Sequence, residues 1–115
     1  MPLLKLETTV PLPEENGKPL LAALSKAVAS ATGKPEQYVM VTGTQSTMVM
    51  SDKAGDAAFV DIRSIGGLNG ETNGKLSQQI CKLLKDSIGI ASDRVYLNFT
   101  DVEAGNWGWN GSTFG

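Results

Sequence analysis

A strand-like run that breaks into glycines and then opens a helix stands at residues 59–70, FVDIRSIGGLNG. Phenylalanine, valine and isoleucine in its first part favour extended chain, and the glycine-rich part ends the strand. Beyond it, apolar residues at three- and four-residue spacing trace one helix face: Leu76, Ile80, Leu83, Leu84 and Ile88. Gly89 ends this helix, and residues 95–100 favour a second strand. The sequence here predicts a strand–helix–strand unit.

The first half of the chain has the same order of features. Residues 3–9 favour a strand, and a break rich in proline then interrupts it. We predict a helix from about Gly17, with Asn16 as its N-cap, Pro19 in its first turn and Gly33 at its end.

The two halves align at an offset of 56 residues, which places Leu3 on Phe59, Gly33 on Gly89 and Val39 on Val95. Extended chain is also predicted for residues 38–42 and 48–50. Two βαβ units related by a pseudo-two-fold axis would produce this repeat. Because both crossovers are right-handed, their helices would cover the same face of one four-stranded sheet. We therefore predict a single two-layer α+β domain over residues 1–115.

One sheet face has no predicted cover. Leu3, Lys5 and Glu7 would point to it, which makes the face semi-polar. The C-terminal tail also carries Trp107, Trp109 and Phe114 within a few residues. Aromatic residues gathered in this way indicate a segment that packs on a partner surface. Both features predict a homo-oligomer.

The composition limits the function. Ten lysines and arginines against twelve acidic residues give 115 residues a net charge of −2, so we expect no nucleic-acid or membrane partner. No run approaches the length of a membrane span, and no signal peptide is recognisable, which predicts a cytoplasmic protein. The chain has no histidine and one cysteine, Cys81, which we interpret as a buried small hydrophobe. No metal site and no cofactor are expected.

Four residues form a candidate site. Removal of Met1 would leave Pro2 with a free secondary amine, which can act as a base. Lys34 follows the first helix, and Tyr96 and Asn98 alternate on the last strand and share one face. Three of them also have a structural alternative: Pro2 as an ordinary second residue, Lys34 as a surface charge at a helix end, and Tyr96 as a core aromatic with an exposed hydroxyl.

Four segments in order along the chain carry a resemblance to a known family. They are residues 31–38 (ATGKPEQY), 64–66 (SIG), 92–98 (SDRVYLN) and 106–114 (NWGWNGSTF). Together with the initial Met-Pro, they closely resemble the macrophage migration inhibitory factor family of the tautomerase superfamily, essentially from end to end.

The resemblance implies the tautomerase fold, assembled as a homotrimer with active sites between subunits. It also implies keto–enol tautomerisation of aromatic 2-oxo acids such as phenylpyruvate, without metal or cofactor. Pro2 would be the base, and Lys34 and the backbone amide of Ile65 would hold the substrate carboxylate. The adjacent subunit would lend Tyr96 and Asn98. Apolar walls could come from Leu3, Tyr38, Trp107 and Phe114.

Physical chemistry agrees with these roles. An α-amine has an ordinary pKa of about 7.7–8.0, and both desolvation and the charge of Lys34 would lower the pKa of Pro2. The base would then be neutral at working pH. This chemistry requires that Met1 is absent, because otherwise the Pro2 nitrogen belongs to an amide.

The sequence also departs from the family pattern. The mammalian cytokines have a CxxC motif where this chain has residues 57–60, AAFV, so no redox role is expected. Trp107 replaces a smaller residue at the pocket rim. Related hydratases and dehalogenases need further arginine and glutamate groups, and Arg63 alone is near. The alternative function is a cytokine-like signalling ligand, released without a signal peptide to a protein receptor, with incidental tautomerase activity.

Overall fold

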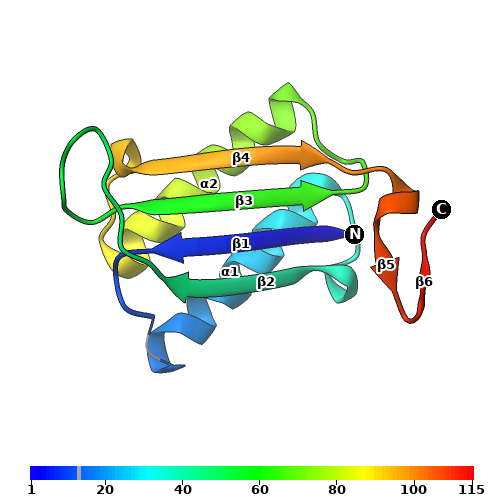
Figure 1. Cartoon of the computed structure of the whole chain (residues 1–115), viewed down its shortest axis with the longest axis horizontal. Coiled ribbons are helices and arrows are strands. Elements are labelled where there is room, and N and C mark those ends of the chain that lie inside the picture. The colour runs from blue at the N-terminus through cyan, green and yellow to red at the C-terminus, as the bar shows by residue number, and fades with distance from the viewer. Residues whose placement is uncertain (13) are drawn as a thin grey trace.

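The computed structural model describes residues 1–12 and 14–115, which form one main sheet, two long helices and a small C-terminal hairpin (Figure 1). The elements in chain order are β1 (Pro2–Thr8), α1 (Glu14–Thr32), η1 (Glu36–Tyr38), β2 (Met40–Gln45), β3 (Ala58–Ser64), α2 (Gly70–Ile88), η2 (Ser92–Arg94), β4 (Val95–Asp101), η3 (Ala104–Asn106), β5 (Gly108–Trp109) and β6 (Ser112–Thr113).

The main sheet has the strand order β2-β1-β3-β4. Each βαβ unit contributes a parallel pair, β1 with β2 and β3 with β4, and the two units join through antiparallel pairing of β1 with β3. The predicted four-stranded α+β sheet is therefore confirmed.

The internal repeat is visible in the element bounds. Strands β1 and β3, helices α1 and α2, and turns η1 and η2 begin and end at positions offset by 56 residues. Strand pairing repeats as well, since Leu3 pairs with Met40 and Phe59 pairs with Tyr96. Gly33 and Gly89 end their helices with φ of 72° and 73°. The two halves are thus equivalent in backbone structure as well as in sequence pattern.

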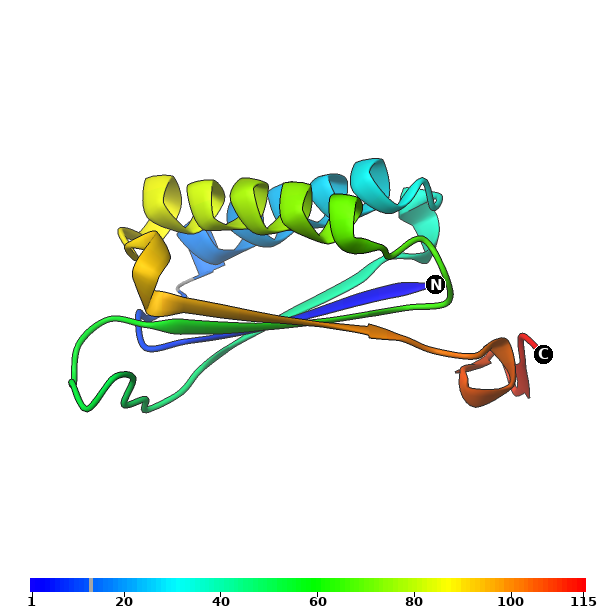
Figure 2. The same ribbon diagram turned by 90° about the horizontal axis from the view of Figure 1, so that it is seen from above.

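Both helices cover the same face of the sheet (Figure 2). The core between the layers consists of buried aliphatic side chains from the sheet and both helices, including Leu4, Leu6, Val60, Ile62, Leu24, Val28, Leu76, Ile80 and Leu84. These helix residues recur at three- and four-residue spacing, so the predicted apolar faces are the ones that are buried. Burial of this apolar surface fixes the helices over the sheet.

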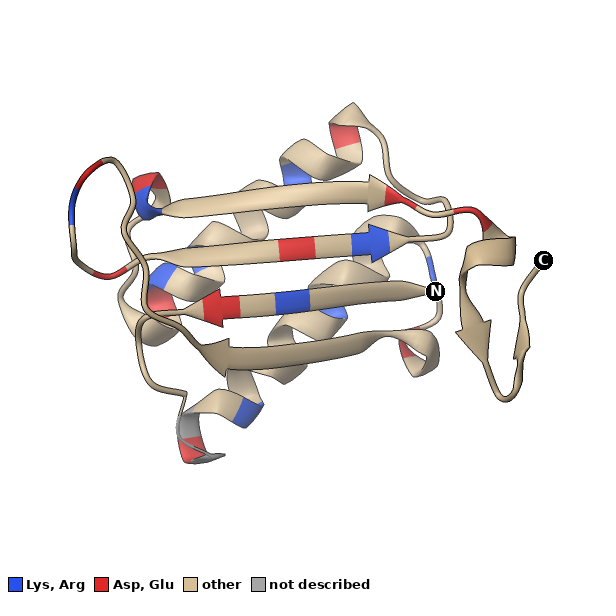
Figure 3. Ribbon diagram, viewed as in Figure 1, with Lys and Arg blue, Asp and Glu red and all other residues tan. Residues whose placement is uncertain are grey.

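The opposite face of the sheet is bare, as predicted. Its charged residues lie on the two central strands (Figure 3). Asp61 pairs in register with Lys5 across the β1–β3 pair and accepts a hydrogen bond from Arg63 at 3.1 Å. The edge strands instead present uncharged side chains to this face, among them Tyr96 with 66% of its surface exposed. The alternative interpretation of Tyr96 as a core aromatic is wrong.

The start of the first helix differs from the prediction. α1 begins at Glu14, so Asn16 lies inside the helix and is not its N-cap, and Pro19 stands in the second turn. Proline there removes one helical hydrogen bond. Leu20 and Leu24, at most 2% exposed, bury enough apolar surface to offset that loss.

The run at residues 48–50 is not a strand. Met50 makes only an isolated bridge with Lys53, inside the loop that joins β2 to β3. The apolar side chains that suggested extended chain have no neighbouring strand in this chain to pair with. No helix in residues 1–12 and 14–115 has the length and hydropathy needed to span a membrane.

Candidate active site at the N-terminal end of the sheet

Pro2 occupies the first position of a central strand. It pairs in register with Ser64 at the end of β3, and its side chain is buried. Proline fits here because the first position of a strand can lack an N–H donor. The chain terminus is therefore held at the sheet end where Lys34 and the β3–α2 turn also lie.

Lys34 is positioned by the end of α1. Gly33 takes the left-handed conformation with φ of 72°, and Thr32 bonds to Val28 O at 2.7 Å through its hydroxyl. The Lys34 N–H donates to the same hydroxyl at 3.4 Å. The half-buried lysine then crosses the turn after β3, since a Cβ built on Gly66 would lie 3.7 Å from Lys34 Nζ. Lys34 is therefore not a solvated helix-end charge.

The turn that carries Ile65 is held from two sides. Ser64 Oγ donates to Gly66 O at 2.7 Å, and Gly66 N–H donates to Asp101 Oδ1 at 2.9 Å. Gly66 and Gly67 have φ of 71° and 77°, a conformation that favours glycine. A side chain at Gly67 would also come within 2.9 Å of Thr32 O. The two glycines thus allow the turn to approach Lys34 closely.

A cavity of about 300 Å³ lies between these groups. It is lined by Met1, Lys34, Pro35, Tyr38, Ile65, Ala104 and Phe114. One cation among mostly apolar walls is suited to a carboxylate attached to an apolar body.

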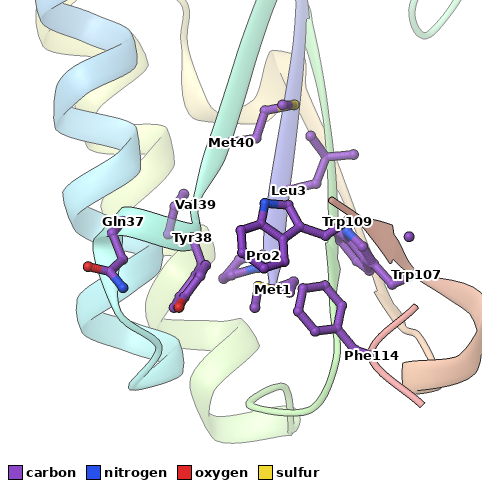
Figure 4. Close-up of a pocket in the computed structure, with 11 residues that line it drawn as sticks. Met1, Pro2, Leu3, Gln37, Tyr38, Val39, Met40, Trp107, Trp109 and Phe114 are labelled. Atoms are coloured by element: carbon purple, nitrogen blue, oxygen red, sulfur yellow. The ribbon is translucent and has the colours of Figure 1, made fainter. Parts of the chain in front are cut away.

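A second cavity, of about 420 Å³, adjoins the first and shares Met1, Tyr38 and Phe114 with it. Its further lining residues are Pro2, Leu3, Gln37, Val39, Met40, Trp107, Gly108 and Trp109 (Figure 4). The Trp109 ring stacks on Phe114 at 5.9 Å between centroids, with 10° between the planes. Tyr38 meets Trp109 edge-on at 6.1 Å. This aromatic cluster forms a wall suited to a flat, apolar ligand.

The tail reaches the site as a hairpin. Val102 N–H donates to Ser64 O at 2.8 Å, which ties the tail to the end of β3. β5 and β6 then pair around Asn110 and Gly111, whose φ values of 51° and 79° form the turn that Asn-Gly favours. Trp107 lines the aromatic cavity, as predicted, but Trp109 is the residue that contacts both Tyr38 and Phe114.

Trp109 was not among the predicted wall residues. The Asn-Gly turn signal could have identified the hairpin, and the hairpin would have brought both tryptophans to one site. Leu3, Tyr38 and Phe114, which were predicted as walls, do line the cavities.

The terminal amine lies in a partly buried environment near the positive charge of Lys34. Burial lowers the pKa of the Met1 α-amine, and the nearby charge of Lys34 lowers this pKa further. Both causes disfavour the cationic amine. The site thus favours a neutral amine at the N-terminus of the chain.

Tyr96 and Asn98 lie elsewhere in the same chain. Asn98 pairs with Asp61, and Asp61 pairs with Lys5, which is three residues beyond Pro2 on β1. Standard strand spacings place Asn98 about 14 Å from Pro2. Tyr96 lies two residues further along β4 from the Pro2 end and borders a different cavity. One chain does not bring these two residues to Pro2.

Within residues 1–12 and 14–115, no group of three histidine, cysteine or acidic side chains is placed to hold a metal ion. Cys81 is half-buried rather than fully buried. Burial raises the pKa of its thiol, although a hydrogen bond with Ser92 acts in the opposite direction. The thiol is therefore poorly suited to act as a nucleophile.

Comparisons with known proteins extend over the whole chain. The family model described as macrophage migration inhibitory factor matches residues 1–115. The macrophage migration inhibitory factor of Rattus norvegicus is 40% identical over 118 aligned residues, covering 99% of each chain.

Solved structures give the same result. A homologue from Prochlorococcus marinus is 38% identical with a TM-score of 0.92, covering 98% of this chain and 99% of that one. The macrophage migration inhibitory factor of Toxoplasma gondii is 30% identical with a TM-score of 0.95, covering 97% and 99%. Sequence and structure agree in confirming the resemblance, and the chain belongs to the macrophage migration inhibitory factor family.

Proposed function

We propose that this protein is a cofactor-independent keto–enol tautomerase of aromatic 2-oxo acids such as phenylpyruvate, with Pro2 as the base after Met1 is removed. Membership of the family supports isomerase or cytokine-like function in general. The choice of reaction rests on one observation. The α-amine lies where a cavity containing Lys34 meets a cavity walled by aromatic side chains.

The two cavities match the two ends of the substrate. The carboxylate binds beside Lys34 and the backbone amide of Ile65, and the aromatic ring binds against Trp109 and Phe114. The reacting carbon and oxygen then lie next to the Pro2 nitrogen. That nitrogen takes the proton from the enol hydroxyl and delivers it to carbon 3, and the reverse reaction follows the same path.

Removal of Met1 transfers the free amine to Pro2, at the first position of β1. Pro2 is buried in the chain that carries Met1. Desolvation and the charge of Lys34 therefore act on the Pro2 amine in the same direction as they act on Met1. A lowered pKa keeps the amine neutral and able to accept a proton near pH 7.

The site is completed by a second copy in the proposed homotrimer. Tyr96 and Asn98 face outward on the bare side of edge strand β4, far from their own Pro2. Exposed large apolar residues gather at both ends of the sheet, Met40 and Trp109 at one end and Val49 and Tyr96 at the other. Head-to-tail contact between unlike ends can close into a ring, and this contact would bring Tyr96 and Asn98 to a neighbour's site.

The decisive experiment compares the wild type with Pro2→Ala, both freed of Met1 and checked by intact mass and sedimentation. Alanine replaces the ring-held secondary amine with a primary amine that no ring orients, so kcat/KM for phenylpyruvate enol is expected to fall by up to about 10²–10⁴. Absorbance of the enol follows the reaction. Wild-type protein that retains Met1 is the matched control and should be equally slow, because its Pro2 nitrogen is an amide. Wild type that retains Met1 and still reacts at the processed rate would show that the Pro2 amine is not the base.

A cytokine-like ligand is the second candidate, favoured by the similarity to the Rattus norvegicus and Mus musculus macrophage migration inhibitory factors. Inhibition of macrophage migration by the purified wild type and by Pro2→Ala separates the two functions. Equal inhibition by both proteins supports signalling without catalysis, and no inhibition by either leaves this candidate without support.

A further inference from the structure

The end of the sheet opposite the candidate active site holds a second concave surface. A groove of about 490 Å³ is lined by residues 47–51 of the β2–β3 loop, by residues 57–59 and by Tyr96. Figure 1 shows this loop at the end of the sheet away from both termini. Tyr96 therefore has the loop as its neighbour, and the position of the loop limits where the phenol ring can lie.

The β2–β3 loop is held in a strained turn. Met50 and Lys53 exchange backbone hydrogen bonds at 3.2 and 3.1 Å, and Ser51 and Asp52 between them have φ of 56° and 60°. This hairpin turn favours asparagine and glycine, and other residues adopt it at a cost. Contacts outside the turn must compensate for that strain.

Arg94 supplies those contacts. Its Nε donates to Asp56 O at 3.1 Å and its Nη1 to Met50 O at 2.7 Å. Its Nη2 reaches Lys53 O at 3.2 Å and Gly55 O at 3.4 Å. One planar guanidinium thus binds four carbonyls of a single loop, a geometry that an ammonium cannot reproduce.

We propose that Arg94 is a positioning residue for Tyr96. Arg94 precedes Tyr96 by two residues, so it joins the loop wall and the Tyr96 strand into one rigid unit. The inference rests on the proposed function, in which a neighbouring copy receives this surface and Tyr96 closes over the bound ring. Loosening the loop would let the phenol leave that position while the catalytic base and its cation remain in place.

The test uses Arg94→Lys, Tyr96→Ala and the double variant. Arg94→Lys keeps the positive charge but loses the planar guanidinium that binds four carbonyls. Binding of cinnamate, an unreactive aromatic carboxylate, is measured by quenching of tryptophan fluorescence in processed protein. Steady-state kinetics with phenylpyruvate run in parallel, and sedimentation monitors assembly. Asp93→Asn, an exposed neighbour in the same turn, is the matched control and should behave as wild type.

Arg94→Lys is expected to weaken cinnamate binding and to raise KM at least fivefold, with the acid limb of the pH–rate profile unchanged. In the Tyr96→Ala background, the same substitution should change either quantity less than twofold. The proposal would be overturned if Arg94→Lys bound cinnamate as tightly as the wild type. It would also be overturned if Arg94→Lys changed binding and KM as much in the Tyr96→Ala background as it does when Tyr96 is present. The second result would mean that Arg94 acts on assembly or folding alone.

Thr9→Val is the second variant, used if Arg94→Lys does not fold, and it should loosen the same loop. Thr9 Oγ1 accepts from Ala57 N–H at 3.0 Å and bonds to Asp56 Oδ1 at 3.3 Å. This variant should also weaken cinnamate binding, again only when Tyr96 is present, and unchanged binding would contradict the proposal.

Wild type that binds cinnamate but does not convert phenylpyruvate would refute the proposed reaction, while the binding measurements would still decide on Arg94. Wild type that binds no cinnamate would overturn both.

Discussion

The two ends of the sheet have the same backbone plan but different chemistry. The 56-residue repeat makes Ala58 the counterpart of Pro2 and Ile90 the counterpart of Lys34. Ala58 is 3% exposed and Ile90 is fully buried. The end of the sheet opposite the candidate active site, here called the distal end, therefore has neither a base nor a cation at these positions. The grooves themselves correspond, because Met40 lines one and its counterpart Tyr96 lines the other.

The residues that hold the two hairpins differ in the same way. At the N-terminal end, Tyr38 packs against Trp109 of the β5–β6 hairpin. At the distal end its counterpart, Arg94, bonds the carbonyl of Lys53, which is the counterpart of Trp109. An aromatic contact leaves an apolar wall for a ligand, whereas a guanidinium clamp leaves a rigid surface for docking. Under the proposed function, the duplicated unit yields one reactive end and one end that supports a neighbouring copy.

Among substitutions that compare the two ends, Lys34→Ile is expected to have the largest effect, because it gives the N-terminal end the side-chain type of the distal end. Loss of a charge-assisted contact to the carboxylate costs about 1.5–3 kcal/mol, so KM for phenylpyruvate should rise about 10- to 100-fold. The Pro2 amine also loses a neighbouring positive charge, which in the chain that carries Met1 lowers the pKa of the α-amine. Its pKa should therefore rise, and the acid limb of the pH–rate profile should move to higher pH.

Lys82→Met is the control for this prediction, because Lys82 forms only an exposed ion pair with Asp86 at 3.4 Å on α2. It should leave both KM and the pH profile unchanged. An acid limb that stays in place in Lys34→Ile would remove Lys34 from any role in tuning the base.

A smaller effect is expected from Trp109→Ala, which removes the aromatic wall without touching the base. Loss of ring contacts worth about 0.5–1.5 kcal/mol should raise KM for phenylpyruvate roughly 3- to 10-fold. Pyruvate, which has no ring, is the matched substrate and should show little change. Equal losses for both substrates would mean that Trp109 supports the fold and does not bind the ring.

The smallest effects on stability and KM are expected from Gly33→Ala and Gly89→Ala, which form a matched pair. Both glycines have left-handed φ and no neighbour close to the added methyl group, so each substitution should destabilise by about 1 kcal/mol in urea unfolding at fixed protein concentration. Only Gly33 precedes Lys34, so only Gly33→Ala should also raise KM. A change of KM in Gly89→Ala would show that the two ends are coupled.

Much of the fold could be predicted because its signals are local and repeated. The apolar spacing of Leu76, Ile80 and Leu84 and the stop at Gly89 fix α2, and the 56-residue offset extends the argument to the first half. The start of α1 could not be placed, since Pro19 looks like a first-turn residue and only core packing shows that it is not. The strand predicted at residues 48–50 was wrong because these apolar residues favour extended chain but have no partner strand in this chain.

The candidate site was harder to predict than the fold. Pro2, Lys34 and Ile65 come to the same end of the sheet because β1 begins there and α1 and β3 end there, which follows from the topology. Trp109 was missed because its contact with Tyr38 depends on the β5–β6 hairpin, which was not predicted. Tyr96 and Asn98 lie apart from Pro2 within one chain, and the proposed role of both residues depends on a second copy, which no pattern within one sequence can place.

Both chain termini lie at the end of the sheet that holds the candidate active site (Figures 1 and 2). An affinity tag or fusion partner at the N-terminus would convert the proposed base into an amide, and one at the C-terminus would begin beside the aromatic wall. Loss of activity in such a fusion would therefore reveal nothing about the enzyme itself. A reporter group belongs on the outer surface of α2, for example at Lys75, whose side chain is 69% exposed.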